Sequence, residues 1–127
     1  MIALDRADGS VRWSSGNGPI SYATPTVGEL AGRTQLVALT NQGIWGFAPE
    51  NGAVLWRHDW LSTPFDSAVS PVFTGKNGVF VSASGAGSLL LRVTPSEQGF
   101  QVETAWETTE VSNDYATSAL VGGSLYG

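Results

Sequence analysis

The chain of 127 residues has no cysteine, one histidine and only six lysine and arginine residues. Without cysteine, disulfide bonds and thiolate metal sites are excluded. The net charge of −5 leaves too little positive charge to neutralise a phosphate backbone, so we expect no nucleic-acid partner. No apolar run approaches the roughly 18–20 residues of a membrane span. We expect no signal peptide in this chain, because Asp5, Arg6 and Asp8 interrupt the N-terminal segment.

Short strands and tight turns are what the chain does contain. It has 16 glycines and five tryptophans, and 42% of its residues are hydrophobic. Turn pairs such as Asp8-Gly9 and Asn51-Gly52 supply the backbone geometry of hairpins. No window shows a helical period. The pattern predicts an all-β protein built from successive hairpins, with strand-like segments at 36–40, 43–47, 53–57, 79–82, 88–93 and 100–106.

Two motifs repeat along the chain. A glycine stands four residues before both Trp13 and Trp56, which are 43 residues apart, and a looser copy ends at Trp106, 50 residues further on. A second motif is centred on positions spaced by 46 and 47 residues, namely Pro25, Pro71 and Ser118. A period of roughly 40–50 residues is typical of the blades of a β-propeller, each made of four antiparallel strands.

The two motifs also predict the phase of the repeat. Small-residue segments such as 22–27 suit inner strands, and the tryptophan segments suit outer strands. We therefore predict a β-propeller segment of four-stranded antiparallel blades, with two complete blades and one blade split between the N- and C-termini. The complete blades are expected at 20–60 and 66–108. Residues 1–15 would end an earlier blade and residues 114–127 would start a later one, which is typical of a cut piece.

The tryptophan motif resembles the PQQ-like repeat family, the propellers related to quinoprotein dehydrogenases and to an outer-membrane assembly lipoprotein. The blade signature of that family is approximately Ala-x-Asp-x-x-Thr-Gly-x-x-x-Trp. The second copy keeps Gly52 and Trp56, and the third keeps Trp106. The first copy matches most fully, at Ala3, Asp5, Gly9 and Trp13.

The resemblance implies a structural role for the repeated tryptophans. In that family such rings dock one blade on the next, which assigns blade docking to Trp13, Trp56 and Trp106, with Gly9 and Gly52 in the adjoining turns. Burying a ring of this size contributes roughly 1.5–3 kcal/mol or more. The alternative role is a stacking platform for a sugar or a quinone, although a ligand site need not repeat.

The resemblance also raises the question of catalysis. The related dehydrogenases hold pyrroloquinoline quinone (PQQ) and Ca²⁺, yet this chain has no obvious cage of 6–8 oxygen ligands for calcium. His58 beside Asp59 lacks a nucleophile elbow, and neighbours on a strand point to opposite faces. We expect no catalytic, cofactor-binding or metal-binding residue and no cofactor. The sequence thus favours a binding surface over an enzyme, with a fragment of a PQQ-dependent dehydrogenase as the alternative.

Loops that lead into the inner strands are the expected place for binding, around the axial funnel of a complete propeller. They carry Tyr22, Trp60, Asp66, Asp114 and Tyr115, which we predict as candidate binding residues. The alternative for the two aspartates is the capping of turns. The resemblance is to bacterial proteins and implies a periplasmic or otherwise extracytoplasmic location.

The expected partners are proteins or peptides, or the remaining blades of a longer protein. A second possibility is a homodimer in which the two terminal half-blades are exchanged to close a six-bladed ring. Truncation of a longer gene is the favoured explanation of the half-blades.

Overall fold

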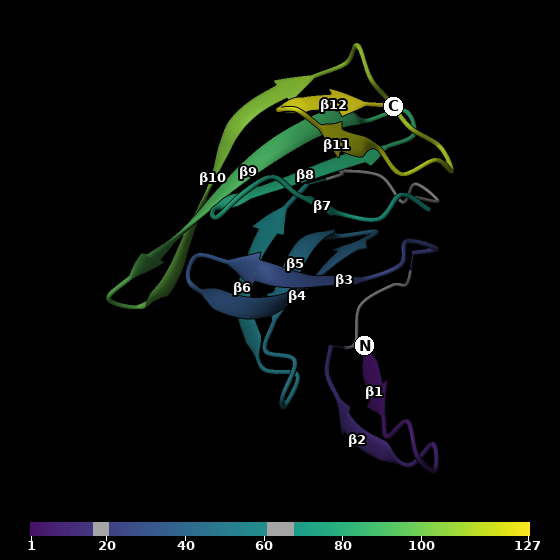
Figure 1. Ribbon diagram of the computed structural model, residues 1–127, viewed down its shortest axis with the longest axis vertical. Coiled ribbons are helices and arrows are strands. Elements are labelled where there is room, and N and C mark those ends of the chain that lie inside the picture. Colours follow the sequence, from purple (N-terminus) through teal and green to yellow (C-terminus); the bar gives the residue numbers. More distant parts are fainter. Residues whose placement is uncertain (17–20, 61–67) are drawn as a thin grey trace.

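The computed structural model describes residues 1–16, 21–60 and 68–127 and shows strands as the regular structure of these segments (Figure 1). None of the described residues belongs to a helix long and apolar enough to span a membrane. The strands are β1 (Ile2–Leu4), β2 (Val11–Ser14), β3 (Thr26–Leu30), β4 (Arg33–Thr40), β5 (Gly43–Phe47), β6 (Val54–Asp59), β7 (Val72–Phe73), β8 (Gly78–Ala83), β9 (Gly87–Ser96), β10 (Gly99–Thr108), β11 (Ala119–Val121) and β12 (Ser124–Tyr126).

These strands form two four-stranded and two two-stranded sheets. The four-stranded sheets have the orders β3-β4-β5-β6 and β7-β8-β9-β10, and every pairing is antiparallel between chain neighbours. The hairpins β1–β2 and β11–β12 stand as separate sheets at opposite ends of the molecule (Figure 1). This arrangement confirms an all-β propeller segment with two whole blades and two half-blades.

The turns of the first two tryptophan motifs have the same geometry. Gly9 and Gly52 have φ angles of 75° and 71°, and each donates its N–H to the carbonyl four residues earlier at 2.8 Å. One residue before each glycine, the side chains of Asp8 and Asn51 accept the N–H two residues further on at 2.9 Å. Both hairpins also carry an irregular register just before the turn. The sequence repeat is therefore a repeat of hydrogen bonds.

Asp8 makes the first of these turns sensitive to acid. The backbone N–H of Ser10, and then its side chain, lower the pKa of Asp8 from the ordinary value of 3.8. A carboxyl group whose pKa is lower in the folded protein than in the unfolded chain stabilises the fold at pH values above its unfolded pKa. This stabilisation is lost as the pH falls through the folded pKa.

We expect the Ser10 amide resonance to shift with the protonation of Asp8 on acidification in an NMR titration. Asp8→Asn, the residue of the second turn, should keep the bond and abolish this shift. A shift that persists in Asp8→Asn would contradict this assignment.

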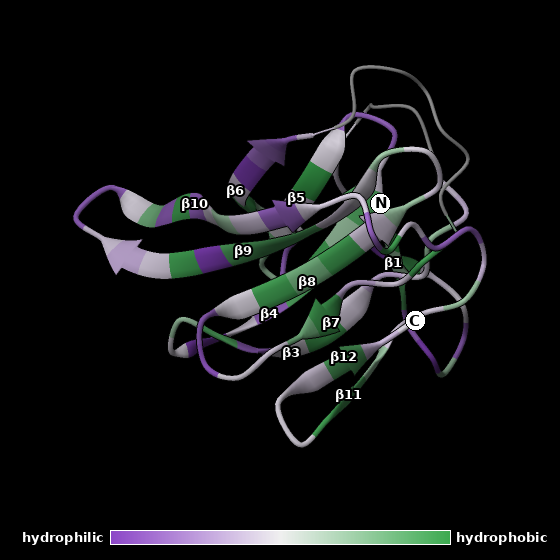
Figure 2. Ribbon diagram, turned by 90° about the horizontal axis from the view of Figure 1, so that it is seen from above, coloured by the Kyte–Doolittle hydropathy of each residue, from purple (hydrophilic) through white to green (hydrophobic). Residues whose placement is uncertain are grey.

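The core lies between the two four-stranded sheets. It is built from the buried apolar residues Leu30, Val37, Leu39, Ile44, Trp56, Val79, Val81, Leu89, Leu91 and Val93. The residues of strands β5, β7 and β8 are largely hydrophobic, whereas those of β6 and of the tip of the β9–β10 hairpin are hydrophilic (Figure 2). Each fully buried aliphatic side chain contributes about 1.5–3 kcal/mol. The shared core explains why the two blades pack as neighbours.

The inner strands begin later than the small-residue motif predicted. We expected a strand over 22–27, but β3 begins only at Thr26, and β7 begins at Val72, directly after Pro71. Proline has no N–H to donate to a ladder, so Pro25 and Pro71 mark the entry to each strand instead of its middle. That part of the prediction is wrong, and the motif forms an extended entry segment.

Hydrogen bonds near these entry segments join one blade to the next. The Thr26 hydroxyl donates to the carbonyl of Pro71 at 3.0 Å. The Ser70 N–H donates to the hydroxyl of Thr117 at 3.1 Å. The Ala31 N–H also donates to the carbonyl of Lys76 at 2.7 Å, so the inner hairpins of the two whole blades are joined at both ends by hydrogen bonds.

Candidate functional site

Trp13 rests on the turn of the following blade. Its indole N–H donates to the carbonyl of Pro49 at 2.9 Å. The ring lies so close to Gly52 that a Cβ there would stand 2.4 Å from a ring carbon. The β1–β2 hairpin is thereby attached to the β5–β6 turn, and only glycine leaves room for this contact.

Trp56 is buried among the core residues of both blades, with 5% of its surface exposed. Its indole N–H donates to the side-chain oxygen of Gln35 at 2.6 Å, and the Gln35 amide donates to the carbonyl of Leu30 at 2.8 Å. Gly46 lies directly beneath the ring, where a Cβ would be 2.2 Å away. The buried polar groups of this cluster therefore satisfy one another.

Trp106 occupies the same repeat position but is 41% exposed. Its ring is tilted against Phe80, with 5.9 Å between the ring centroids. Beside it lies a cavity of about 430 Å³, also lined by Leu90, Leu120 and Leu125, between the β7–β10 sheet and the β11–β12 hairpin. Docking remains a prediction for all three tryptophans. Trp106 differs from Trp56 because its ring is partly exposed to solvent.

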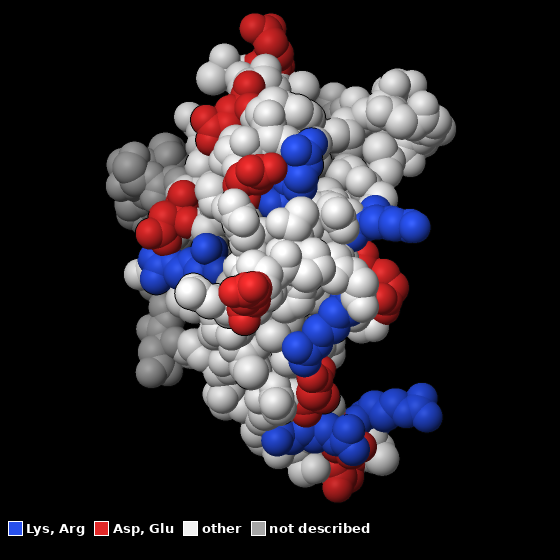
Figure 3. Space-filling view, turned by 90° about the vertical axis from the view of Figure 1, so that its left-hand side faces the viewer, with Lys and Arg blue, Asp and Glu red and all other residues white. Residues whose placement is uncertain are grey.

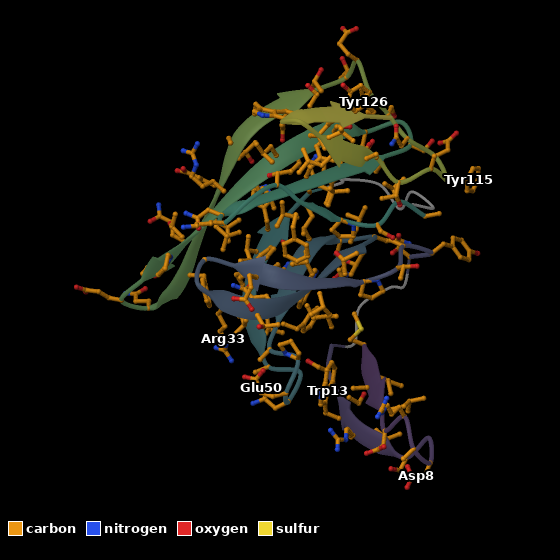
Figure 4. All side chains as sticks on the ribbon, viewed as in Figure 1. Asp8, Trp13, Arg33, Glu50, Tyr115 and Tyr126 are labelled. Carbon is orange, nitrogen blue, oxygen red and sulfur yellow. The ribbon has the colours of Figure 1, made fainter. Side chains whose placement is uncertain are left out.

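The predicted loop residues fall into different environments. Tyr22 and Tyr115 are 73% and 82% exposed. Asp114 is exposed beside Tyr115, which projects away from the sheets (Figure 4). Trp60 is half-buried and packs against the core. Asp66 lies outside the described residues. The structure therefore leaves Tyr22, Asp114 and Tyr115 on the surface and draws Trp60 inward.

The two tyrosines occupy equivalent places in the repeat. Tyr22 stands four positions before Thr26, where β3 begins, and Tyr115 stands four positions before Ala119, where β11 begins. The match extends the internal repeat into the loops. The equivalent position before β7 is Ala68, so the entries to β3 and β11 carry an exposed phenol ring and the entry to β7 does not.

Polar side chains hold the loop that carries Tyr115. The Asn113 N–H donates to the buried hydroxyl of Ser82 at 2.8 Å, and the Asn113 side-chain amide donates to the carbonyl of Ala116 at 2.9 Å. The same amide donates to the Ser118 hydroxyl at 2.9 Å. Tyr115 is thus presented by an anchored loop.

Sequence reasoning placed Asn113 in a loop that leads into an inner strand, but it did not identify Ser82 or Gln35. The burial of Gln35 could have been predicted, because it stands two positions before Val37 and four before Leu39, on the same buried face of β4. A polar residue at a buried strand position needs a partner, and Trp56 is that partner. Asn113 has two nearby partners, Ala116 and Ser118, but its contact with Ser82 comes from another hairpin and has no comparable signal.

The other face of the β3–β6 sheet carries an aromatic groove of about 190 Å³ next to the β1–β2 hairpin. Trp45 and Phe47 stack there with centroids 6.0 Å apart, and the Arg57 guanidinium lies 4.8 Å from the centre of the Trp45 ring. The indole nitrogen of Trp45 is buried without a hydrogen-bond partner in the described parts of the chain. Trp45 is one of two tryptophans that the repeat leaves unexplained.

Charged side chains are interspersed over the surface. The face shown in Figure 3 mixes acidic and basic groups without a patch of one sign. The ion pairs are exposed and contribute little to stability; they are Arg12–Asp5, Arg33–Glu50, Arg57–Asp59 and Arg92–Glu103. Within residues 1–16, 21–60 and 68–127, no three histidine or acidic side chains gather as a metal site.

Comparison with known proteins agrees with this geometry. A family model described as outer membrane protein assembly factor BamB matches residues 1–127. No curated protein and no solved structure gave a match. The family match covers the whole sequence, and its repeat corresponds to the blades and equivalent turns of the structure. The chain therefore belongs to the PQQ-like repeat propellers of the outer membrane protein assembly factor BamB family.

Proposed function

We propose that the chain is a non-catalytic propeller segment that presents a surface to protein or peptide partners. The observation that supports this role is the exposure of Tyr22 and Tyr115 at equivalent positions of two inner-strand loops. Tyrosine is enriched among the residues that dominate binding energy at protein interfaces, because its ring offers a large contact area and a polar tip.

The family description suggests the class of partner. It names the assembly of outer-membrane proteins, and the strands of such proteins alternate apolar and polar residues in segments of about ten residues. We propose that the tyrosine loops bind extended segments of this kind, in a periplasmic or otherwise extracytoplasmic compartment. The remaining blades of a longer protein are a second class of partner.

Replacing both tyrosines by alanine is expected to weaken binding of a fluorescent peptide with alternating apolar and polar residues. Fluorescence anisotropy should show a loss of about tenfold or more, which corresponds to ~1.4 kcal/mol. Val54→Ala, at an exposed apolar position on β6, is the matched control and should bind as the unchanged chain does. Equal affinity of the tyrosine variant and this control would contradict the proposed surface.

The alternative, a fragment of a PQQ-dependent dehydrogenase, is tested in parallel. Calorimetric titration with Ca²⁺ and the quinone should give no heat beyond dilution. A stoichiometric tight complex with the absorbance of the bound quinone would overturn the non-catalytic role.

A further inference from the structure

The joint between the two whole blades carries a groove of about 330 Å³. Its walls come from the segment after β6, from the β8–β9 turn and from the end of β10. Both walls belong to the four-stranded sheets, so the half-blades contribute nothing to the groove. Ligand sites in proteins typically occupy clefts of about 300–1,000 Å³. The lining residues are Trp60, Ala86, Ser88, Glu107, Thr108 and Thr109.

The outer strands of the two blades hold these walls together. Strands β6 and β10 pack against each other, and the Thr104 hydroxyl lies 3.2 Å from Nε2 of His58, the single histidine of the chain. Trp60 follows β6 directly and packs against the apolar core that the two blades share. Trp60 is half-buried and lines the groove, so it contributes an aromatic surface that the core holds in place.

A bulge on β10 sets the direction of Glu107. The register shifts between Thr104 and Trp106, and after the shift Glu107 pairs with Leu89. Leu89 is fully buried in the core between the blades, and residues directly opposite each other in an antiparallel pair have side chains on the same face of the sheet. The Glu107 carboxylate is therefore directed toward the blade that carries Trp60. Bulges of this kind often re-aim a side chain beside a functional site.

The groove has the electrostatic character of a cation site. Among the described residues that line it, Glu107 is the one charged side chain and none is basic. Each ion pair within residues 1–16, 21–60 and 68–127 uses a different carboxylate, so Glu107 has no cationic partner in those parts of the chain. The face of an indole ring also attracts cations. Ring and carboxylate together favour a positively charged ligand.

The chain itself shows which cation fits such a pair of groups. Arg57 and Glu107 occupy equivalent positions, each directly after a tryptophan of the repeat. The Arg57 guanidinium lies 4.8 Å from the centre of the Trp45 ring, and its Nε donates to the Asp59 carboxylate at 2.5 Å. An indole ring and a carboxylate thus hold an arginine on the other face of the β3–β6 sheet.

We propose that the groove binds an arginine side chain of a partner protein or peptide. The guanidinium stacks on the Trp60 ring while its N–H groups donate to the Glu107 carboxylate. Arginine suits both contacts better than lysine does, because its planar fork of donors can stack and pair at once. This inference deepens the proposed function and rests on it for the identity of the partner, whereas the arginine site can be tested alone.

The first test uses N-acetyl-arginine amide as the probe and requires no peptide. The Trp60 indole N–H resonance, assigned with Trp60→Phe, should shift saturably at millimolar concentrations of the probe. Glu107→Gln should weaken this binding about fivefold, and N-acetyl-citrulline amide, the uncharged analogue, should cause no saturable shift. An unmoved Trp60 resonance, equal responses to the two probes, or saturable binding of glucose in place of the arginine probe would overturn the site.

The second test places an arginine in the alternating fluorescent peptide. The arginine peptide should bind about fivefold more tightly than the same peptide with citrulline at that position, and Glu107→Gln should abolish the difference. Glu103→Gln is the matched control, because it removes the same charge from the other face of β10, where Glu103 pairs with Arg92. This control should keep the difference. A preference for arginine that survives in Glu107→Gln would contradict the proposed contact.

Replacing Tyr22 and Tyr115 separates this site from the tyrosine surface. The double alanine variant should weaken the binding of both peptides alike and leave the ratio of their affinities unchanged. Absence of binding by either peptide to the unchanged chain would disprove the proposed partner, and the shift of the Trp60 resonance with N-acetyl-arginine amide would then decide the arginine site by itself.

Discussion

Replacing Trp56 by alanine is expected to lower the free energy of unfolding by about 3–5 kcal/mol, the usual cost of truncating a buried tryptophan. The ring is 5% exposed and contacts the core of both blades. Small domains are stable by only about 5–15 kcal/mol, so this variant should be close to unfolding at room temperature. Urea denaturation followed by tryptophan fluorescence and circular dichroism measures the loss.

Trp106→Ala provides the matched comparison at the equivalent position of the next blade. Because this ring is 41% exposed, the cost should be about 1 kcal/mol. Equal losses in the two variants would show that repeat position, and not burial, decides the contribution of each ring.

The hydrogen bond from Trp56 to Gln35 can be separated from the packing of the ring. Trp56→Phe removes the donor and leaves the Gln35 side-chain oxygen without its partner. Gln35→Met removes the acceptor and leaves both the Trp56 indole N–H and the Leu30 carbonyl without the Gln35 side chain. An orphaned group of this kind costs about 1–3 kcal/mol. The double variant should lose less than the sum of the two single losses. Strict additivity would mean that the 2.6 Å contact contributes nothing.

Gly52→Ala has the second large expected effect, a loss of about 2–5 kcal/mol. One part is the positive φ of 71°, which costs a residue with a Cβ roughly 1–2 kcal/mol. The other part is the collision of the new methyl group with the Trp13 ring, for which overpacking costs of about 1–3 kcal/mol are typical. Thermal and urea unfolding should both detect the change.

Gly9→Ala isolates the first of these two parts. The turn has the same backbone geometry, and no neighbour lies within 4 Å of the added methyl group, so this variant should lose only the roughly 1–2 kcal/mol of the φ angle. Introducing Gly52→Ala into a Trp13→Ala background should reduce its cost to that of Gly9→Ala. An undiminished cost in that background would contradict the close contact between Trp13 and Gly52.

The repeat allowed the blades to be predicted because their turns depend on local chemistry. The motif that includes Asp8-Gly9 and Asn51-Gly52 carries the information for a turn within six residues, and the structure shows that turn twice. The entry of the inner strand was misplaced because Pro25 belongs to the small-residue motif yet cannot donate to the ladder. The local sequence thus predicted which strands and turns form better than it predicted the residues at which the strands begin.

The environments of the candidate residues could not be predicted in the same way. Trp56 and Trp106 have equivalent motifs, but one ring is covered by a neighbouring blade and the other is half-open. Trp60, a candidate binding residue in a loop, is half-buried and packs against the core, and its binding role stays a prediction. Burial at these positions depends on residues far along the chain, which a single motif does not specify. The exposure of Tyr22 and Tyr115 agrees with their expected place in loops, and their binding role stays a prediction.

The pairing of each strand with its neighbour in sequence has a consequence for the folding of this chain. Every hydrogen-bonded pair in the two four-stranded sheets closes across a single turn or loop, so the entropy lost on closure is small at each step. A blade can form as soon as its four strands have left the ribosome, in the order in which they are translated. Contacts between blades come last, and damage to one hairpin should delay only the steps that follow it.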